Sequence, residues 1–158
     1  MKADRIKIIN DQIGFAATDT VCFRAPYPEE LRQLQDREWM PVIKRMNDSG
    51  CDFKITDGLD VPDLSEKTML FLEKRLNSLS DEALCAFAAV SGGCRSVILA
   101  FAVLDGFLSA ERAFDLSVLE ETFQNCFWNQ DEEALTAREN RKAAVVEAAK
   151  KLKGTENG

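Results

Sequence analysis

The chain contains no histidine, the side chain that most often serves as a general base or as a zinc ligand. Ser-His-Asp and Cys-His catalysis within the chain are therefore excluded. The cysteines are odd in number and widely spaced, and they form no Cys-x-x-Cys pair: Cys22, Cys51, Cys85, Cys94 and Cys126. We interpret them as small buried hydrophobes in a reducing compartment, and we expect no metal site.

Long apolar runs and an excess of basic residues are also missing. The longest apolar stretch, Val97–Leu104, is far shorter than the ~20 residues of a membrane-spanning helix. The first ten residues lack the apolar run of a secretory signal. The formal net charge of −7 disfavours nucleic acids and anionic membrane surfaces. We expect a soluble protein that binds no nucleic acid, does not insert into membranes and carries no cofactor.

The length of 158 residues favours a single domain with one core. Residues 1–17 are weakly patterned, and we expect an N-terminal extension or linker there, either a short helix or an irregular segment. Residues 18–153 are predicted to form one mostly α-helical domain. Residues 154–158 are predicted to be a disordered tail.

Two short segments have the pattern of strands. Thr20–Phe23 is β-branched or apolar, and Cys51–Thr56 alternates apolar and polar residues as a half-buried strand does. Asp57-Gly58 then predicts a turn. Because no other segment resembles a strand, these two are predicted to pair as a small two-stranded β ribbon near the N-terminus.

The remaining segments predict a mainly α fold, a bundle of about five to six helices. A helix from about residue 29 to 47 contains Pro41, which should kink or split it. Ser65, Ser80 and Ser109 are predicted N-caps of later helices. In the first of these three helices Met69, Leu72 and Leu76 should face inward. Arg95 to Leu104 is apolar nearly all round and should be the central buried helix, and a last helix should run from about Asp131 to Leu152.

The segment Leu119–Glu133 is the densest in candidate site residues. Its acids, Glu120, Glu121, Asp131, Glu132 and Glu133, suggest a carboxylate pair for acid–base chemistry, a cation site or a solvated acidic surface. For the last three we favour charges in a helix's first turn. Glu121 and Gln124 share a helix face beside phenylalanines, which indicates a recognition patch.

Four residues outside this segment are assigned structural roles, namely Asp19, Arg24, Trp39 and Ser96, and the role of Trp128 is left open. Asp19 and Arg24 flank the first strand-like segment, and Arg24 is predicted to tie it to the following helix. Trp39 is predicted to be a core residue whose indole N–H bonds a carbonyl. For Trp128 a core position and an exposed anchor for a partner are equally supported.

The segment from Ser91 to Ser96 leads into the buried helix with two glycines. Helix N-terminal amides can hold an anion, and Arg95 could assist. Since the lysine and spacing of a phosphate loop are absent, we favour glycines that allow two helices to pack closely.

Several of these pieces together resemble the C-terminal domain of the ATP synthase α-subunit assembly chaperones of mitochondria and α-proteobacteria. The resemblance covers about Thr18 to Leu152. It rests on four motifs in this order: Thr18–Ala25; Leu34-Gln35 with Trp39-Met40-Pro41-Val42; Ser91–Ala102 with Ser96; and Leu119-Glu120-Glu121 with Phe123-Gln124, Trp128 and Asp131-Glu132. Asn129 stands where the family has glycine, and the family's β-rich N-terminal domain has no counterpart, as in a fragment or a shortened relative.

The resemblance implies a non-enzymatic protein of the mitochondrial matrix or the α-proteobacterial cytoplasm. Its partner would be the free ATP synthase α subunit, whose apolar face it would shield until the β subunit takes its place. Glu121 is the first candidate for the functional acid, with Glu120, Gln124, Trp128 and Asp131 as its neighbours. The alternatives are a hydrolase or small-ligand-binding domain using Glu120 or Glu121 with Asp131, and a helical interaction module with another partner. No oligomeric state is indicated.

Overall fold

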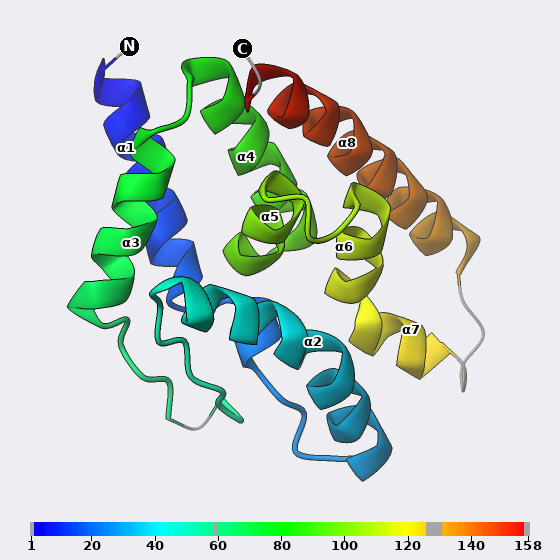
Figure 1. Cartoon of the computed structure of the whole chain (residues 1–158). Coiled ribbons are helices and arrows are strands. Elements are labelled where there is room, and N and C mark those ends of the chain that lie inside the picture. Colours follow the sequence, from blue (N-terminus) through cyan, green and yellow to red (C-terminus); the bar gives the residue numbers. More distant parts are fainter. Residues whose placement is uncertain (1, 59, 126–130, 157–158) are drawn as a thin grey trace.

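The computed structural model describes residues 2–58, 60–125 and 131–156. These residues form eight α-helices and one short 3-10 helix (Figure 1). In chain order they are α1 (Lys2–Ala16), η1 (Thr20–Cys22), α2 (Glu29–Ser49), α3 (Glu66–Asn77), α4 (Asp81–Cys94), α5 (Val97–Leu104), α6 (Ala110–Ser117), α7 (Leu119–Asn125) and α8 (Glu132–Glu156).

The short helix α5 is the centre of the core, as its apolar sequence predicts. All eight of its residues are buried, and α4, α6, α2, α8 and α1 pack around it. Phe101 of α5 meets Phe87 of α4 edge to face, with ring centroids 4.7 Å apart. Within the described part of the chain, no helix combines the length and apolarity needed to cross a membrane.

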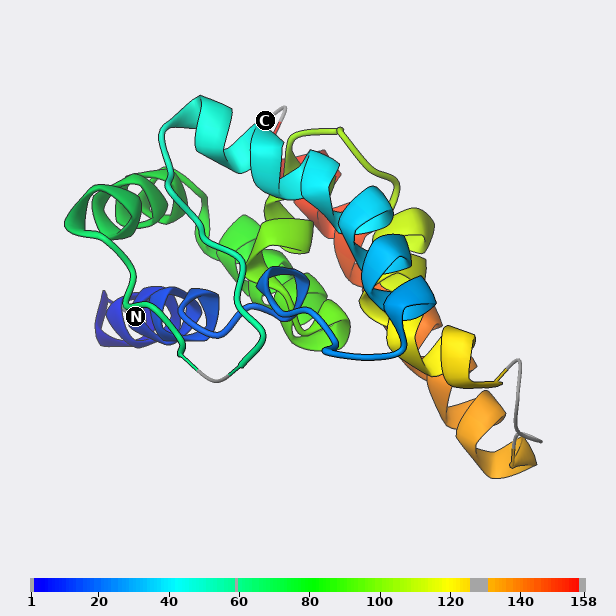
Figure 2. The same cartoon turned by 90° about the horizontal axis from the view of Figure 1, so that it is seen from below.

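The helices form an elongated arrangement in which the two ends differ. The helices α1 and α3 lie side by side at one end, while α7 and the first turns of α8 lie at the other (Figures 1 and 2). The helix α2 crosses the molecule below α5 and reaches α7 (Figure 1). It runs unbroken across Pro41, which lies on its exposed side, where water can satisfy the carbonyl that proline leaves unpaired.

Three serine caps predicted from the sequence are confirmed. Ser65, Ser80 and Ser109 each precede a helix and accept a hydrogen bond from the backbone N–H three residues later. Such caps satisfy donors that have no partner inside the helix, so they fix where α3, α4 and α6 begin. The predicted inward position of Met69 is wrong, because its side chain is 38% exposed. Thr68 is buried instead, where its hydroxyl bonds the backbone N–H of Asp52 at 3.0 Å.

The predicted β ribbon is wrong, because the described residues contain no strand. Its two segments do meet, but only through one isolated parallel bridge between Phe23 and Thr56. The first segment is wound into η1, which Asp19 caps through the Val21 N–H. In the second, the N–H and carbonyl of Phe53 both bond the Asn47 side chain. Side chains therefore take the backbone groups that a ribbon would have paired.

The helix count also exceeds the predicted five to six. The N-terminal segment before Thr18 forms α1, of which Ile9 and Ala16 are buried in the core. The helix capped by Ser109 stops at Val118, whose N–H bonds the Phe114 carbonyl. The Ser117 hydroxyl donates to that same carbonyl, a local bond that competes with helix continuation. A new helix, α7, then begins at Leu119 and places the acidic segment in a separate element.

Among the described cysteines, Cys22, Cys51 and Cys94 are buried, whereas Cys85 is exposed. Burial raises the pKa of the Cys22 and Cys94 thiols to about 12, so both stay protonated and unreactive. Cys126 lies outside the described residues.

Asp19 is a buried carboxylate that joins the N-terminal turn to the central helix. Its Oδ1 accepts from the Ser96 hydroxyl at 2.6 Å, and its Oδ2 accepts from the Ile98 N–H at 2.9 Å. Ser96 in turn caps α5 through the Leu99 N–H. Burial raises the pKa of Asp19 to about 6, although the hydrogen bonds from Ser96, Ile98 and Val21 act in the opposite direction.

Asp19 should therefore make stability depend on pH. Since the folded-state pKa of about 6 exceeds the ordinary value of 3.8, the folded protein binds the proton more tightly than the unfolded chain. The resulting stabilisation is complete below pH 3.8 and is lost as the pH rises through 6. In denaturant titrations, the stability advantage over Asp19→Asn should shrink by about 2 kcal/mol between pH 4 and pH 7. An advantage that stays constant over this range would contradict the assignment.

The two glycines near the end of α4 should respond oppositely to alanine. A Cβ at Gly93 would lie 2.3 Å from Cγ2 of the buried Val145 in α8, whereas a Cβ at Gly92 meets nothing within 4 Å. Gly93→Ala should cost about 1–3 kcal/mol, because α4 and α8 must separate. Gly92→Ala should gain up to about 1 kcal/mol through helix propensity. Equal unfolding midpoints for the two variants would show that the contact is not limiting.

Candidate functional site

The helix α7 presents its polar side chains to solvent at one end of the molecule. Glu120, Glu121 and Gln124 are exposed, whereas Leu119 packs against the core. The first turn of α7 is held by a hydrogen bond from the Thr122 N–H to the Val118 carbonyl. The predicted pair Glu121 and Gln124 therefore lies on an accessible surface.

Glu121 has one ion-pair contact. Its Oε2 lies 3.8 Å from Nη1 of Arg138 on α8, and its side chain is 51% exposed. At this distance and exposure the pair contributes little to stability, so Glu121 can exchange Arg138 for another cation at small cost. Arg138 was not a candidate from the sequence, because it lies on another helix and shares no short-range pattern with Glu121.

Glu120 borders a different feature, an open groove between η1, α2 and α7. The groove has a volume of about 240 Å³. We call it the Glu120 groove; it is lined by Thr18, Thr20, Phe23, Arg24, Ala25, Gln35, Trp39 and Glu120. These residues come from three of the four motifs quoted above, which are far apart in the sequence. Their motifs were recognised in the sequence, but the sequence does not indicate that these residues line one groove.

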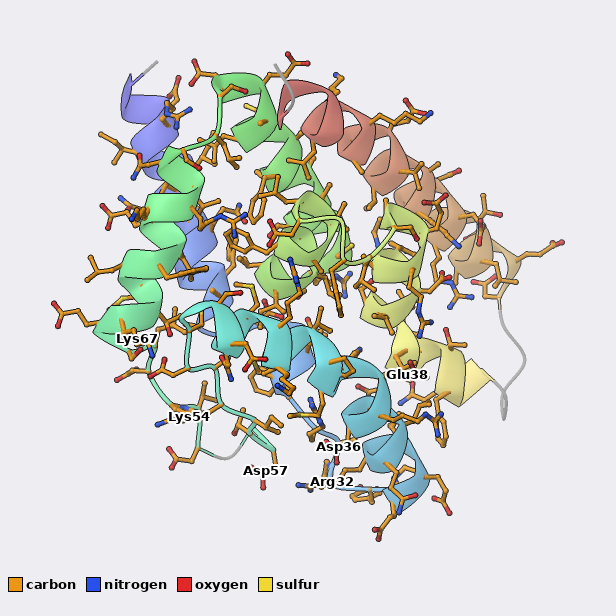
Figure 3. All side chains as sticks on the ribbon, viewed as in Figure 1. Arg32, Asp36, Glu38, Lys54, Asp57 and Lys67 are labelled. Atoms are coloured by element: carbon orange, nitrogen blue, oxygen red, sulfur yellow. The ribbon has the colours of Figure 1, made fainter. Side chains whose placement is uncertain are left out.

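Arg24 is the most constrained polar side chain of the groove. It is 2% exposed, and its Nε donates to Asp36 Oδ1 at 2.6 Å. Its Nη1 donates to the carbonyls of Val21 and Phe23, while its Nη2 has no hydrogen-bond partner. The guanidinium lies 5.5 Å from the centroid of the Trp39 ring. Arg24 therefore ties η1 to α2 through Asp36, which is labelled on α2 in Figure 3.

Trp39 and Gln35 fix α2 against its neighbours from the same side. The buried Trp39 indole N–H donates to the Leu116 carbonyl at 2.9 Å, which connects α2 to the end of α6. Gln35 accepts from the Ala25 N–H at 2.8 Å. Glu38 adds an ion pair to α6 through Arg112 at 2.6 Å, and Figure 3 shows Glu38 where α2 approaches α6 and α7. These bonds hold α7 beside the groove.

The remaining candidate residues are separated from Glu121. Asp131 caps α8: its Oδ1 accepts from the Glu133 N–H at 3.1 Å, and its carbonyl accepts from Leu135 N–H. Its carboxylate therefore has a local structural role, and the structure places neither Glu121 nor Asp131 in the lining of the Glu120 groove. Trp128 and Asn129 lie outside the described residues. Among the residues that are described, no group of three or more cysteine or acidic side chains could hold a metal ion.

Comparison with known proteins identifies relatives over nearly the whole chain. The model of the family described as ATP12 chaperone protein matches residues 1–47. The chain is 30% identical over 142 residues to the Schizosaccharomyces pombe protein named Protein atp12, mitochondrial, a match that covers 84% of this chain and 48% of that protein. The chain thus spans about half the length of this curated relative.

Solved structures agree with the sequence match. Atp12 from Paracoccus denitrificans superimposes with a TM-score of 0.89 at 28% identity, covering 94% of this chain and 64% of that one. The Atu1473 protein of Agrobacterium tumefaciens gives a TM-score of 0.87 at 27% identity, covering 97% of this chain and 57% of the other. On the matching family model, the curated relative and these shared folds, the chain belongs to the ATP12 chaperone family.

Proposed function

We propose that the chain is an assembly chaperone for ATP synthase. In this proposal it binds the free α subunit of the soluble catalytic sector and shields its inter-subunit surface until the β subunit replaces it. The observation that carries the proposal is the TM-score of 0.89 to a solved Atp12 over 94% of the chain. Because the chain spans about half of its curated relative, the proposal concerns what this helical part contributes to binding.

The chemistry of α7 supports a binding role. A free subunit exposes apolar surface that aggregates if nothing covers it. Glu121 and Gln124 are exposed beside the half-buried Phe123, so acidic, amide and aromatic groups are available together. The weak contact with Arg138 leaves the Glu121 carboxylate free to pair with a basic residue of the subunit. Glu121 is therefore the leading partner-binding acid, with Glu120 and Gln124 beside it.

The same geometry gives less support to a hydrolase. A carboxylate pair needs two acids facing one substrate position. Here Glu121 faces Arg138, Glu120 borders a separate groove, and Asp131 caps a helix. We accordingly propose a non-enzymatic protein that acts in the mitochondrial matrix or the α-proteobacterial cytoplasm, the compartments in which its partner subunit would be assembled.

The first test reverses one charge on α7. Glu121→Lys should lower affinity for isolated α subunit by about tenfold or more, since it places like charges against a basic partner surface. Helical content by circular dichroism should stay unchanged, because the side chain is 51% exposed. Glu73→Lys, at an exposed position on the distant helix α3, is the matched control and should bind normally. Equal weakening by both variants would mean that net charge, and not this site, controls binding.

The second test concerns release. Purified β subunit added to a preformed complex should displace the chain from the α subunit, because both are proposed to cover the same surface. The displaced fraction, measured by size-exclusion chromatography, should rise with β-subunit concentration. A stable complex containing all three proteins would contradict a shared surface.

A further inference from the structure

A second hollow lies on the other side of the turn that borders the Glu120 groove. It has an open volume of about 330 Å³, and we call it the Arg95 hollow. It is lined by Phe15, Thr18, Thr20, Ser91, Gly92, Arg95 and Ser96. Thr18 and Thr20 line both features, so the two form one continuous surface. This surface collects residues from all four of the motifs quoted above.

Arg95 has a backbone conformation that arginine adopts unwillingly. Its φ of 54° and ψ of 34° are left-handed, and it is the one non-glycine residue with positive φ in the described ranges. The position ends α4, where glycine is the residue best suited to such a conformation. The Thr20 hydroxyl donates to the Arg95 carbonyl at 2.7 Å, and this bond involves the backbone of Arg95 and not its side chain. Folding stability alone would therefore favour glycine at position 95.

The Arg95 side chain is available for an interaction outside the chain. Residue 95 is exposed, and its guanidinium makes no hydrogen bond or ion pair with any residue in the described part of the chain. The nearest buried acid, Asp19, is already occupied by Ser96 and two backbone N–H groups. An accessible guanidinium without a carboxylate is suited to an acidic group brought by another molecule.

The rest of the hollow is suited to an apolar side chain. Phe15, on the last turn of α1, lines the hollow and is 57% exposed. Gly92 leaves the floor bare, because a Cβ there would meet nothing within 4 Å. Close helix packing accounts for Gly93, which contacts Val145, but it does not account for Gly92. A side chain entering here would cover Phe15 without displacing any residue of the fold.

We propose that the Arg95 hollow binds a segment of the partner subunit that carries a carboxylate next to an apolar side chain. The carboxylate pairs with the Arg95 guanidinium, and the apolar side chain lies over Gly92 against Phe15. This proposal rests on the proposed chaperone function and adds a second contact with the opposite charge preference to Glu121. Together they predict that the subunit presents a basic residue to Glu121 on α7 and an acidic residue to the Arg95 hollow.

Two substitutions separate binding from folding. Arg95→Gly relieves the left-handed strain, so the melting temperature should rise by about 2 °C, while affinity for isolated α subunit should fall about tenfold. Gly92→Leu fills the hollow from an exposed helical position, so the melting temperature should be unchanged or higher while affinity falls. Arg95→Lys should retain part of the affinity. Lys74→Ala, which removes an exposed charge on α3, should bind normally.

The outcomes distinguish this proposal from the chaperone function itself. If the unchanged chain fails to bind the α subunit in calorimetry, both are overturned. If it binds and neither Arg95→Gly nor Gly92→Leu weakens binding, the Arg95 hollow is overturned and the chaperone function stands. If Gly92→Leu instead dissociates a dimer of the chain in sedimentation and leaves subunit affinity intact, the occupant is a second copy and the proposal is wrong.

Discussion

The buried carboxylate of Asp19 is the constraint on which the rest of the structure depends. It receives hydrogen bonds from the turn that follows it and from the start of α5, two segments separated by more than seventy residues of sequence. A carboxylate without these donors would be too costly to bury, and the donors without it would be unsatisfied. The turn therefore has one position relative to the core. The Glu120 groove and the Arg95 hollow are both lined by residues of that turn, so their shape depends on the Asp19 carboxylate.

A second set of polar contacts fixes the position of α7 relative to the core. Arg24 joins η1 to α2, and the Trp39 indole joins α2 to the last turn of α6. Only Val118 separates α6 from α7, so the contacts of Arg24 and Trp39 also orient the acids of α7. Glu120 consequently borders a groove formed mainly by the N-terminal third of the chain, and Glu121 faces α8. The acids of α7 stay accessible to solvent because buried residues elsewhere position the helix.

Local chemistry could be predicted from the sequence, whereas long-range pairing could not. The serine caps and the buried helix follow from single residues and an apolar run, so they were predicted correctly. The ribbon failed because Asn47 and Asp19, outside the strand-like segments, bond the backbone inside them. The break at Val118 depends on one side-chain bond from Ser117. Glu120 and Glu121 were identified from the sequence as candidate site residues. Their surroundings, the Glu120 groove and Arg138, depend on tertiary contacts that cannot be predicted from the spacing of residues in the sequence.

The long reach of two hydrogen bonds has a consequence for when the protein becomes competent during synthesis. The Asp19–Ser96 bond and the Trp39–Leu116 bond each connect residues 77 positions apart. The turn thus has no fixed place until α5 has left the ribosome, and the groove has no second wall until α6 and α7 have followed. A nascent chain carrying only the N-terminal half would expose its motifs without arranging them. Under the proposed function, recognition would begin only after most of these residues have been made, so unfinished chains would not engage a subunit that they could not yet shield.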